Sequence, residues 1–536
     1  MVEIFRNVFV TQLQHLVNIW SLLYRDPKDG SNKGGIAVKK KRVWTCIVLA
    51  GTLIAGCSSG SNNNAASNSG QSANRAPESS TVAMGDRAPV PQKQEGMYFQ
   101  DYGTNPFVSA EEDALSTFAI DVDTGSYTIA RNYIENGSLP PGEAVRLEEY
   151  VNYFDMAYEP PADGTFAIHA DAGPSPFEDD HYELVRIGVK GKEVEPEERK
   201  RANLTFVIDV SGSMDRGNRI DLVKQSLELL VEELNGDDTI GIVVYGSTAH
   251  DVLAPTAVEE RDRILKAIGG LTIEDSTNVE DGLLLGYRMA NESFDPAAVN
   301  RIILCSDGVA NVGETGPEGI LEKIERYAEE QIYLSTFGFG MGNYNDVLME
   351  QLADKGDGVY AYIDDMQEAK KVFGTELTGT LQTIAQEAKI QVAFDPEKVE
   401  EYRLLGYENR AVADEDFRNH RVDGGEVGAG HSVTALYAVR TKERASGEIG
   451  KVTIRYKEPE SETFQEMTSA IRLSGELSIE SRFLASVAKF AELLKDGGEE
   501  VNGNVLSEVR RLARDSAGSK EQEAFVQLLD QVMELR

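Results

Sequence analysis

The central part of the chain alternates short apolar runs with longer amphipathic ones. Five apolar runs rich in β-branched and aromatic residues predict buried β-strands, at 204–210, 239–246, 301–307, 332–340 and 359–364. Four segments with apolar residues at helical spacing lie between them and predict helices, at 220–234, 279–291, 317–329 and 345–353. The run 249–255 predicts a short edge strand. Such alternation is typical of a doubly wound α/β fold, whose mostly parallel sheet carries helices on both faces.

The segments on either side of this region predict strands of another kind. Two strand-like runs, 165–173 and 182–191, precede it, and four follow, at 389–395, 402–408, 432–440 and 451–457. Apolar and polar residues alternate with period two in the last two runs, which indicates antiparallel strands with one exposed face. We therefore expect the flanking strands to pair into one β-sandwich, with the α/β domain inserted between them.

Helical spacing also appears at 145–154 and throughout the C-terminal part, where three apolar stripes predict three helices. The resulting division is a presequence with signal peptide (1–56), a flexible tether (57–96), an N-terminal region (97–202), the α/β domain (203–380), a β-rich domain (381–476) and C-terminal helices (477–536).

The N-terminal segment predicts export and lipid anchoring. Three lysines and Arg42 precede an apolar stretch of about 14 residues, which is too short to span a bilayer but suits a secretory signal. The stretch ends in Ile54-Ala55-Gly56-Cys57, which resembles the bacterial lipoprotein signal, so we expect Cys57 to be lipidated. The basic region should stand near the true start, so we expect translation to begin near Val38. The Ser/Asn/Gly-rich stretch after Cys57 is typical of a flexible tether.

Composition excludes several function classes. The chain has 53 Lys and Arg residues against 90 Asp and Glu residues, a formal charge of −37, which argues against a nucleic-acid partner. Its three cysteines and six histidines show no zinc spacing, so a transition-metal enzyme is not expected.

Oxygen-bearing side chains gather where the predicted strands of the α/β domain end. Asp209, Ser211 and Ser213 follow the first strand, Thr277 precedes the helix at 279, and Asp307 ends the strand at 301–307. Ligands of doubly wound folds bind at the carboxyl ends of the strands. An all-oxygen set with few carboxylates suits Mg²⁺, with Mn²⁺ or Ca²⁺ left open. The sequence therefore predicts a divalent-metal site.

These five residues resemble the metal-ion-dependent adhesion site of the von Willebrand factor type A (VWA) domain, whose pattern is Asp-x-Ser-x-Ser, then Thr, then Asp. The flanks are similar to bacterial VWA lipoproteins with an N-terminal VWA-associated region and a C-terminal domain of unknown function. The segments that carry this likeness are FAIDVDTGSY (118–127), EEYVNYF (148–154), GYENR (406–410) and GHSVTALY (430–437). The resemblance implies direct ligation by Ser211, Ser213 and Thr277, with Asp209 and Asp307 acting largely through water.

We expect a non-catalytic adhesion module, because a metal with two carboxylates and an open position attracts an acidic side chain from a protein partner. Its specificity would come from the loops at 214–218, 247–250, 272–276, 309–316 and 340–344, with Met214 either an exposed contact or helix-entry packing. The expected location is the cell envelope, on the outer membrane where the cell has two membranes, because Ser58 rather than Asp follows Cys57.

Two other readings stay open. An envelope scaffold would act through the β-sandwich and helices. Asp123-Thr124-Gly125 matches the aspartic-protease triplet, but that chemistry needs two carboxylates sharing a proton, from a second triplet or from a homodimer, and no second triplet occurs in the chain. Asp123 or Ser126 capping a helix that starts near Tyr127 is the favoured interpretation.

Overall fold

The computed structural model describes residues 97–177, 182–274, 276–308, 316–342, 344–459, 461–497 and 503–535. The predicted signal peptide, Cys57 and the tether lie outside these residues, as does most of the predicted loop at 309–316. Within the described ranges, no helix combines the length and the apolar character needed to cross a membrane.

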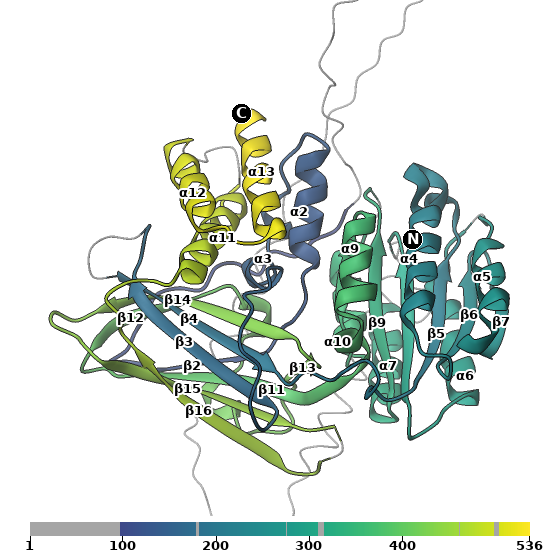
Figure 1. Ribbon diagram of the computed structural model, residues 1–536, viewed down its shortest axis with the longest axis horizontal. Helices are drawn as coiled ribbons and strands as arrows, with labels where there is room; N and C mark the ends of the chain where they lie inside the picture. Colours follow the sequence, from purple (N-terminus) through teal and green to yellow (C-terminus); the bar gives the residue numbers. More distant parts are fainter. Residues whose placement is uncertain are drawn as a thin grey trace, which may run out of the picture. The chain divides into compact units, whose positions relative to one another are not determined.

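The α/β domain is built on a six-stranded sheet with the order β10-β9-β8-β5-β6-β7 (Figure 1). All neighbouring pairs are parallel except β6 and β7, so the predicted edge strand runs antiparallel. The strands are β5 (Ala202–Asp209), β6 (Thr239–Tyr245), β7 (Ala249–Ala257), β8 (Val299–Ser306), β9 (Ile332–Phe339) and β10 (Tyr360–Ile363). The doubly wound fold that the sequence predicts is confirmed.

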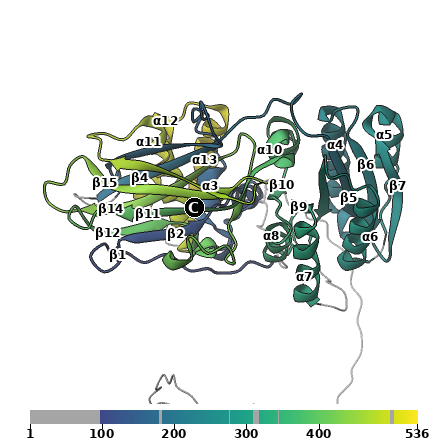
Figure 2. The same ribbon diagram turned by 90° about the horizontal axis from the view of Figure 1, so that it is seen from below.

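Helices cover both faces of this sheet (Figure 2). One face packs against α4 (Arg219–Glu233), α5 (Arg261–Gly269), α9 (Met366–Lys370) and α10 (Leu377–Leu381). The other face packs against α6 (Val279–Glu292), α7 (Gly316–Glu329) and α8 (Asp346–Asp354). Short helical turns join these elements: η2 (Gly212–Asn218), η3 (Val258–Glu260) and η4 (Lys371–Thr375). Because both faces are covered, strand β5 has no exposed residue, as its uninterrupted apolar run predicts.

Strands from before and after the α/β domain form two antiparallel sheets that share one apolar core, which confirms the predicted sandwich. The first sheet has the order β1 (Val108–Ser109), β12 (Val399–Leu405), β14 (Ser432–Thr441), β4 (Tyr182–Gly191), β3 (Phe166–Pro174). The second contains β13 (Gly425–Gly428), β11 (Thr383–Phe394), β15 (Glu448–Lys457) and β16 (Phe464–Arg472), with β2 (Leu115–Ala119) paired to β11. Both flanks contribute strands to each sheet, so neither flank forms the sandwich alone.

A layer of helices packs on the outer face of the first sheet (Figure 1). It consists of α2 (Gly125–Glu135), α3 (Leu147–Asn152), α11 (Ile479–Lys495), α12 (Gly503–Ser516) and α13 (Lys520–Glu534). The predicted apolar stripes form its interior, where Phe154, Phe483 and Phe525 pack edge to face. The turns η1 (Gly142–Ala144), η5 (Glu408–Arg410) and η6 (Asp414–Asp416) complete the flanks.

The chain enters and leaves the α/β domain at one place. The backbone nitrogen of Lys200 donates to Oε1 of Gln382 at 2.9 Å, so the two connecting segments lie side by side. The α/β domain is therefore an insertion with adjacent ends.

Candidate metal centre

The candidate site lies where the order of the central strands reverses. The chain leaves β5 towards β6 on one side and returns as β8 on the other, and β5 pairs with both strands. Asp209 ends β5, and Asp307 directly follows β8. This topology brings the two carboxylates, 98 positions apart in the printed sequence, to one edge of the sheet.

Four of the five predicted residues are joined by hydrogen bonds. The backbone nitrogen of Ser211 donates to Oδ1 of Asp209 at 2.8 Å. The hydroxyls of Ser211 and Ser213 lie 3.0 Å apart, and Ser213 Oγ donates to Oδ1 of Asp307 at 2.8 Å. Ser211 is the N-cap residue of η2, yet its side chain makes no capping hydrogen bond. A helix-capping role therefore does not account for this serine.

Thr277 lies on a neighbouring loop and makes no hydrogen bond to the other four residues, all of which are described. Its loop is held to the end of β5, because the nitrogen of Glu274 donates to the carbonyl of Val210 at 2.6 Å. Asn278, the next residue, caps α6 by accepting from the nitrogen of Asp281. Thr277 is half-buried beside the site rather than part of its hydrogen-bond chain.

Burial and an internal cation set the charge of the site. Burial raises the pKa of Asp209 to about 6, against hydrogen bonds from Ser211 and Ser306 that favour the ionised form. Burial also raises the pKa of Asp307, while Ser213 and Arg219 oppose the shift. Arg219 forms an ion pair with Oδ2 of Asp307. Both oxygens of Asp307 are thus engaged within the chain.

The spacing of these oxygens fits an octahedral cation. Adjacent ligands of Mg²⁺, at about 2.1 Å from the ion, lie roughly 3 Å apart. The oxygens of Ser211, Ser213 and Asp307 follow one another at 3.0 and 2.8 Å. Among the described residues, no group of three His, Cys, Asp or Glu side chains could hold a metal, so any metal here would depend on hydroxyl ligands. The set fits a hard, oxygen-preferring cation.

The structure decides between the two readings of Met214. Its side chain is fully buried in the core beneath α4 and belongs to helix-entry packing. The alternative reading, an exposed apolar contact beside the metal, is wrong, because the first turn of η2 directs this side chain inward. The loop segments 247–250 and 272–274 keep exposed or half-buried residues at the rim.

Asp123 belongs to a buried ionic cluster rather than to an open site. It is 7% exposed, and it accepts from the nitrogen of Tyr360 at 2.8 Å. Arg410 pairs with Asp121 at 3.0 Å and with Asp123 at 3.5 Å, which ties the predicted protease triplet to a residue of the other flank. No substrate carbonyl could approach a carboxylate enclosed in this way.

The expected helix cap at this position is wrong. Helix α2 begins at Gly125, and its N-cap Thr124 makes no side-chain cap. The Asp123 carboxylate is occupied by Tyr360 and Arg410, and the Ser126 hydroxyl donates to the carbonyl of Ala144 at 2.6 Å. Tertiary partners have thus replaced the local capping bond.

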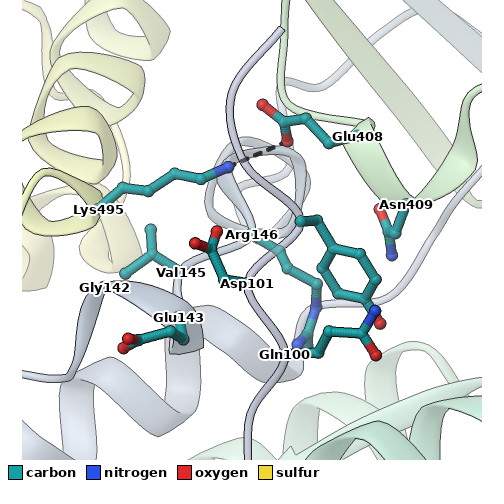
Figure 3. A pocket seen from close by; sticks show the side chains of 10 residues that line it. Gln100, Asp101, Gly142, Glu143, Val145, Arg146, Glu408, Asn409 and Lys495 are labelled. Atoms are coloured by element: carbon teal, nitrogen blue, oxygen red, sulfur yellow. Dashed lines mark ion pairs between the residues drawn. The ribbon is translucent and has the colours of Figure 1, made fainter. Parts of the chain in front are cut away.

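Two hollows lie near this ionic cluster, apart from the candidate metal centre. One is lined by residues that include Arg146, Glu408 and Lys495, and it is too narrow to admit a water molecule (Figure 3). Figure 3 shows Lys495 reaching from α11 towards Glu408, with which it forms an ion pair of 3.1 Å. A second hollow of about 210 Å³ is also lined by Glu408 and Lys495. Arg403 and Glu492 line it as well, and they form an ion pair of 2.6 Å. Paired charges line both hollows.

Sequence reasoning missed two residues at the candidate metal centre. Ser306 donates to Oδ2 of Asp209 at 2.9 Å, and Arg219 pairs with Asp307. Ser306 carries no signal beyond its place next to Asp307. Arg219 does, because a basic residue at the first position of a helix opposes the helix dipole and needs a compensating anion.

Known family models match both the α/β domain and its flanks. The family model "von Willebrand factor type A domain" matches residues 203–375, and the model "von Willebrand factor" matches 93–186. The model "Uncharacterized protein YfbK, C-terminal" matches 379–447 and 439–535. The chain is 34% identical to uncharacterized protein YfbK of Escherichia coli (strain K12) over 463 residues, which cover 81% of this chain and 80% of that protein.

Other proteins are less similar to this chain. Inter-alpha-trypsin inhibitor heavy chain H3 of Mesocricetus auratus is 27% identical over 264 residues, covering 45% of this chain and only 29% of that protein. Among solved structures, a von Willebrand factor type A protein from Catenulispora acidiphila has a TM-score of 0.44 at 15% identity, over 70% of this chain and 91% of that one. The ArnB paralog VWA2 from Sulfolobus acidocaldarius has a TM-score of 0.36 at 17% identity, over 69% and 97%.

The α/β fold and the matched models define a VWA-domain protein. More narrowly, the chain belongs to the family of YfbK, which it matches along most of its length, including the C-terminal β-rich and helical parts.

Proposed function

We propose that this chain is a lipid-anchored protein of the bacterial envelope whose VWA domain binds a protein partner through a divalent metal, without catalysing a reaction. One observation carries the proposal. Oxygens of Ser211, Ser213 and Asp307 follow one another at 3.0 and 2.8 Å at the strand edge where the fold places ligands.

The residues that would hold the metal are Asp209, Ser211, Ser213, Thr277 and Asp307. The two serine hydroxyls and Thr277 would supply neutral oxygens, and the two carboxylates would supply the charge. A bound divalent cation would supply an electrophilic position that accepts an oxygen ligand from another molecule. Mg²⁺ suits this set, with Mn²⁺ as a close substitute.

Binding rather than hydrolysis is supported by the composition of the set. It contains two carboxylates and three hydroxyls but no histidine, and Ser213 donates to Asp307, whose basicity is lowered by its ion pair with Arg219. A serine nucleophile needs a base that removes its proton. An acidic side chain of a partner protein is the ligand that such a site would accept.

Anchoring rests on the sequence around Cys57. We propose that the cysteine carries the acyl chains and that the stretch up to about residue 96 holds the folded part away from the membrane. Metabolic labelling with a radioactive fatty acid tests this. Label should enter the wild-type chain and be absent from Cys57→Ser, and equal labelling of both would contradict the anchor.

The metal dependence is tested on the full chain purified in detergent. Partner capture from an envelope extract should be lost in EDTA and restored by excess Mg²⁺. Ser211→Ala and Asp307→Ala should lose capture in the presence of Mg²⁺. Ser507→Ala, which changes an exposed serine of α12, is the matched control and should behave as wild type.

The same experiment distinguishes the scaffold function. A scaffold that uses the sandwich and the helices would capture its partner equally well in EDTA and in Asp209→Ala. That result would contradict the metal-bridged function.

A further inference from the structure

Arg219 lies inside the candidate metal centre. Its side chain is 12% exposed, and it pairs with Oδ2 of Asp307, whose side chain is 2% exposed. The guanidinium also donates to the carbonyl of Ser213 at 3.3 Å and to that of Met341. These contacts join the loop after β5, the end of β8 and the loop after β9.

The surrounding backbone is built to accommodate this side chain. Gly340 has a φ of 81°, and a Cβ at this position would collide with the Arg219 side chain. Arg219 is also the first residue of α4, where the helix dipole disfavours a positive charge. The position of the guanidinium therefore depends on Asp307 and on the two carbonyls, which outweigh an unfavourable local field.

Arg219 changes the net charge of the candidate metal centre. Asp209, Asp307 and Arg219 sum to −1 when both carboxylates are ionised. A divalent cation brings the site to +1, and one carboxylate ligand brings it to zero. Without Arg219, the metal alone would neutralise the site, and a carboxylate ligand would leave it at −1.

We propose that Arg219 determines which kind of ligand the site prefers. Its guanidinium is a permanent cation that shares Asp307 with the metal, so the metal-loaded site lacks one negative charge. A single carboxylate is therefore the preferred ligand. This inference rests on the proposed metal-binding function. Arg219 weakens metal binding by competing for Asp307, and it strengthens carboxylate binding once the metal is in place. The two effects have opposite signs, which separates them from a merely structural role.

The test uses the full chain in detergent, Mn²⁺ as the metal and acetate as the carboxylate probe, with acetamide as its neutral counterpart. Proton relaxation of water reports Mn²⁺ uptake, and its change on adding acetate reports occupation of the open position. Arg219→Gln should bind Mn²⁺ at least tenfold more tightly, and its Mn²⁺-loaded form should bind acetate at least tenfold more weakly. Acetamide should bind equally to both proteins.

Arg216→Gln is the matched control. Arg216 belongs to the same turn, is exposed, and carries the same charge. It should leave both affinities within about threefold of wild type, because solvent screens exposed charges. If Arg219→Gln matches Arg216→Gln in a chain that does take up Mn²⁺, this inference is wrong and the proposed function stands. If wild type takes up no Mn²⁺, both are wrong.

Two further variants keep the test decisive where Arg219→Gln does not fold, as judged by circular dichroism. Arg219→Lys keeps the charge and should retain acetate binding within about threefold. Gly340→Ala keeps the charge but displaces the guanidinium, and it should weaken acetate binding as Arg219→Gln does. Weakening of both Mn²⁺ and acetate binding by these variants would mean that Arg219 only holds the loops together, and it would overturn the proposal.

Discussion

Burial favours the neutral form of Asp209, whereas holding a metal would require the ionised form. Burial raises its pKa to about 6, so in the folded, metal-free chain the carboxyl is protonated below that pH and ionised above it. A group with a raised pKa contributes stability that is fully present below its unfolded pKa and is lost as the pH rises through its folded pKa. At pH 8 the ionised Asp209 therefore destabilises the chain when no metal is bound.

The variant Asp209→Asn should stabilise the metal-free chain at pH 8 by about 1–3 kcal/mol, because it removes a buried charge and keeps the shape. It should also abolish Mg²⁺ uptake. Urea unfolding in EDTA measures the first effect and calorimetry the second. The difference in stability should shrink as the pH falls through 6, and it should vanish only below about pH 3.8, where Asp209 is protonated in both the folded and the unfolded chain. A variant that is less stable than wild type at pH 8 would show that the ionised carboxylate holds the loop.

Met214 provides a separate test at the same loop. Its side chain is fully buried, so Met214→Ala should lower the free energy of unfolding by about 2–4 kcal/mol. Met533→Ala, at a position 38% exposed, should change it by less than about 0.5 kcal/mol. Chemical unfolding of both variants decides the matter. A cost below about 1 kcal/mol for Met214→Ala would restore the idea of an exposed contact.

At the scale of elements, helix α3 and helix α8 are joined by buried charges. Arg146, the N-cap residue of α3, is 3% exposed and pairs with Glu149 and with Asp346 at the start of α8. Glu350 lies 3.9 Å away on the same helix. Removing Arg146 would leave the buried carboxylates of Glu149 and Asp346 without their counter-charge.

Arg146→Met should therefore cost about 3–5 kcal/mol of unfolding free energy. Adding Asp346→Asn should recover part of that cost, because one of the unpaired carboxylates is removed, and urea unfolding of the four proteins gives the coupling. Arg263→Met, which breaks an exposed pair with Glu260, should cost less than about 1 kcal/mol. Additive effects of the two buried changes would contradict the pairing.

The helices and strands differ in how well the sequence predicts them. The strands of the VWA sheet and the helices α4, α6, α7 and α8 were predictable because each carries a strong apolar run or stripe. Helix α5 was missed because only Ile264 and Ile268 of its nine residues are buried. The short helices α9 and α10 span five residues each, too few for a periodic pattern.

The sequence predicts which residues of the candidate site lie close together where the sheet topology alone determines their distance. It does not predict contacts with partners that stand far away along the chain. Asp209 and Asp307 meet because parallel strands end at the same edge of a sheet. The role of Asp123 was not predictable, since its partner Arg410 stands 287 positions later and has no local signature. The hypothesis of a sandwich built from both flanks succeeded because period-two strands on either side of an α/β domain need partners for their apolar faces.

At the scale of the whole molecule, the VWA domain is inserted into the flanks but also shares a core with them. Ile129 and Tyr133 of α2 pack into the same cluster as residues of α6, α8 and β10. The connecting segments meet where Lys200 contacts Gln382. A short glycine-serine linker could therefore replace residues 203–380 without stretching the sandwich.

We expect the chain without its VWA domain to fold, because both sheets and the helical layer take their strands and helices from the flanks. It should show one cooperative urea transition and lower stability than the full chain, since one face of α2 becomes exposed.

Ile129→Ala separates this effect from general damage. In the full chain, where Ile129 is fully buried, the substitution should cost about 2–4 kcal/mol. In the shortened chain it should cost less than about 1 kcal/mol, because the side chain has lost its partners there. Equal costs in the two chains would mean that Ile129 is held by the flanks, and that the VWA domain is attached to them by its two connections and its ion pairs alone.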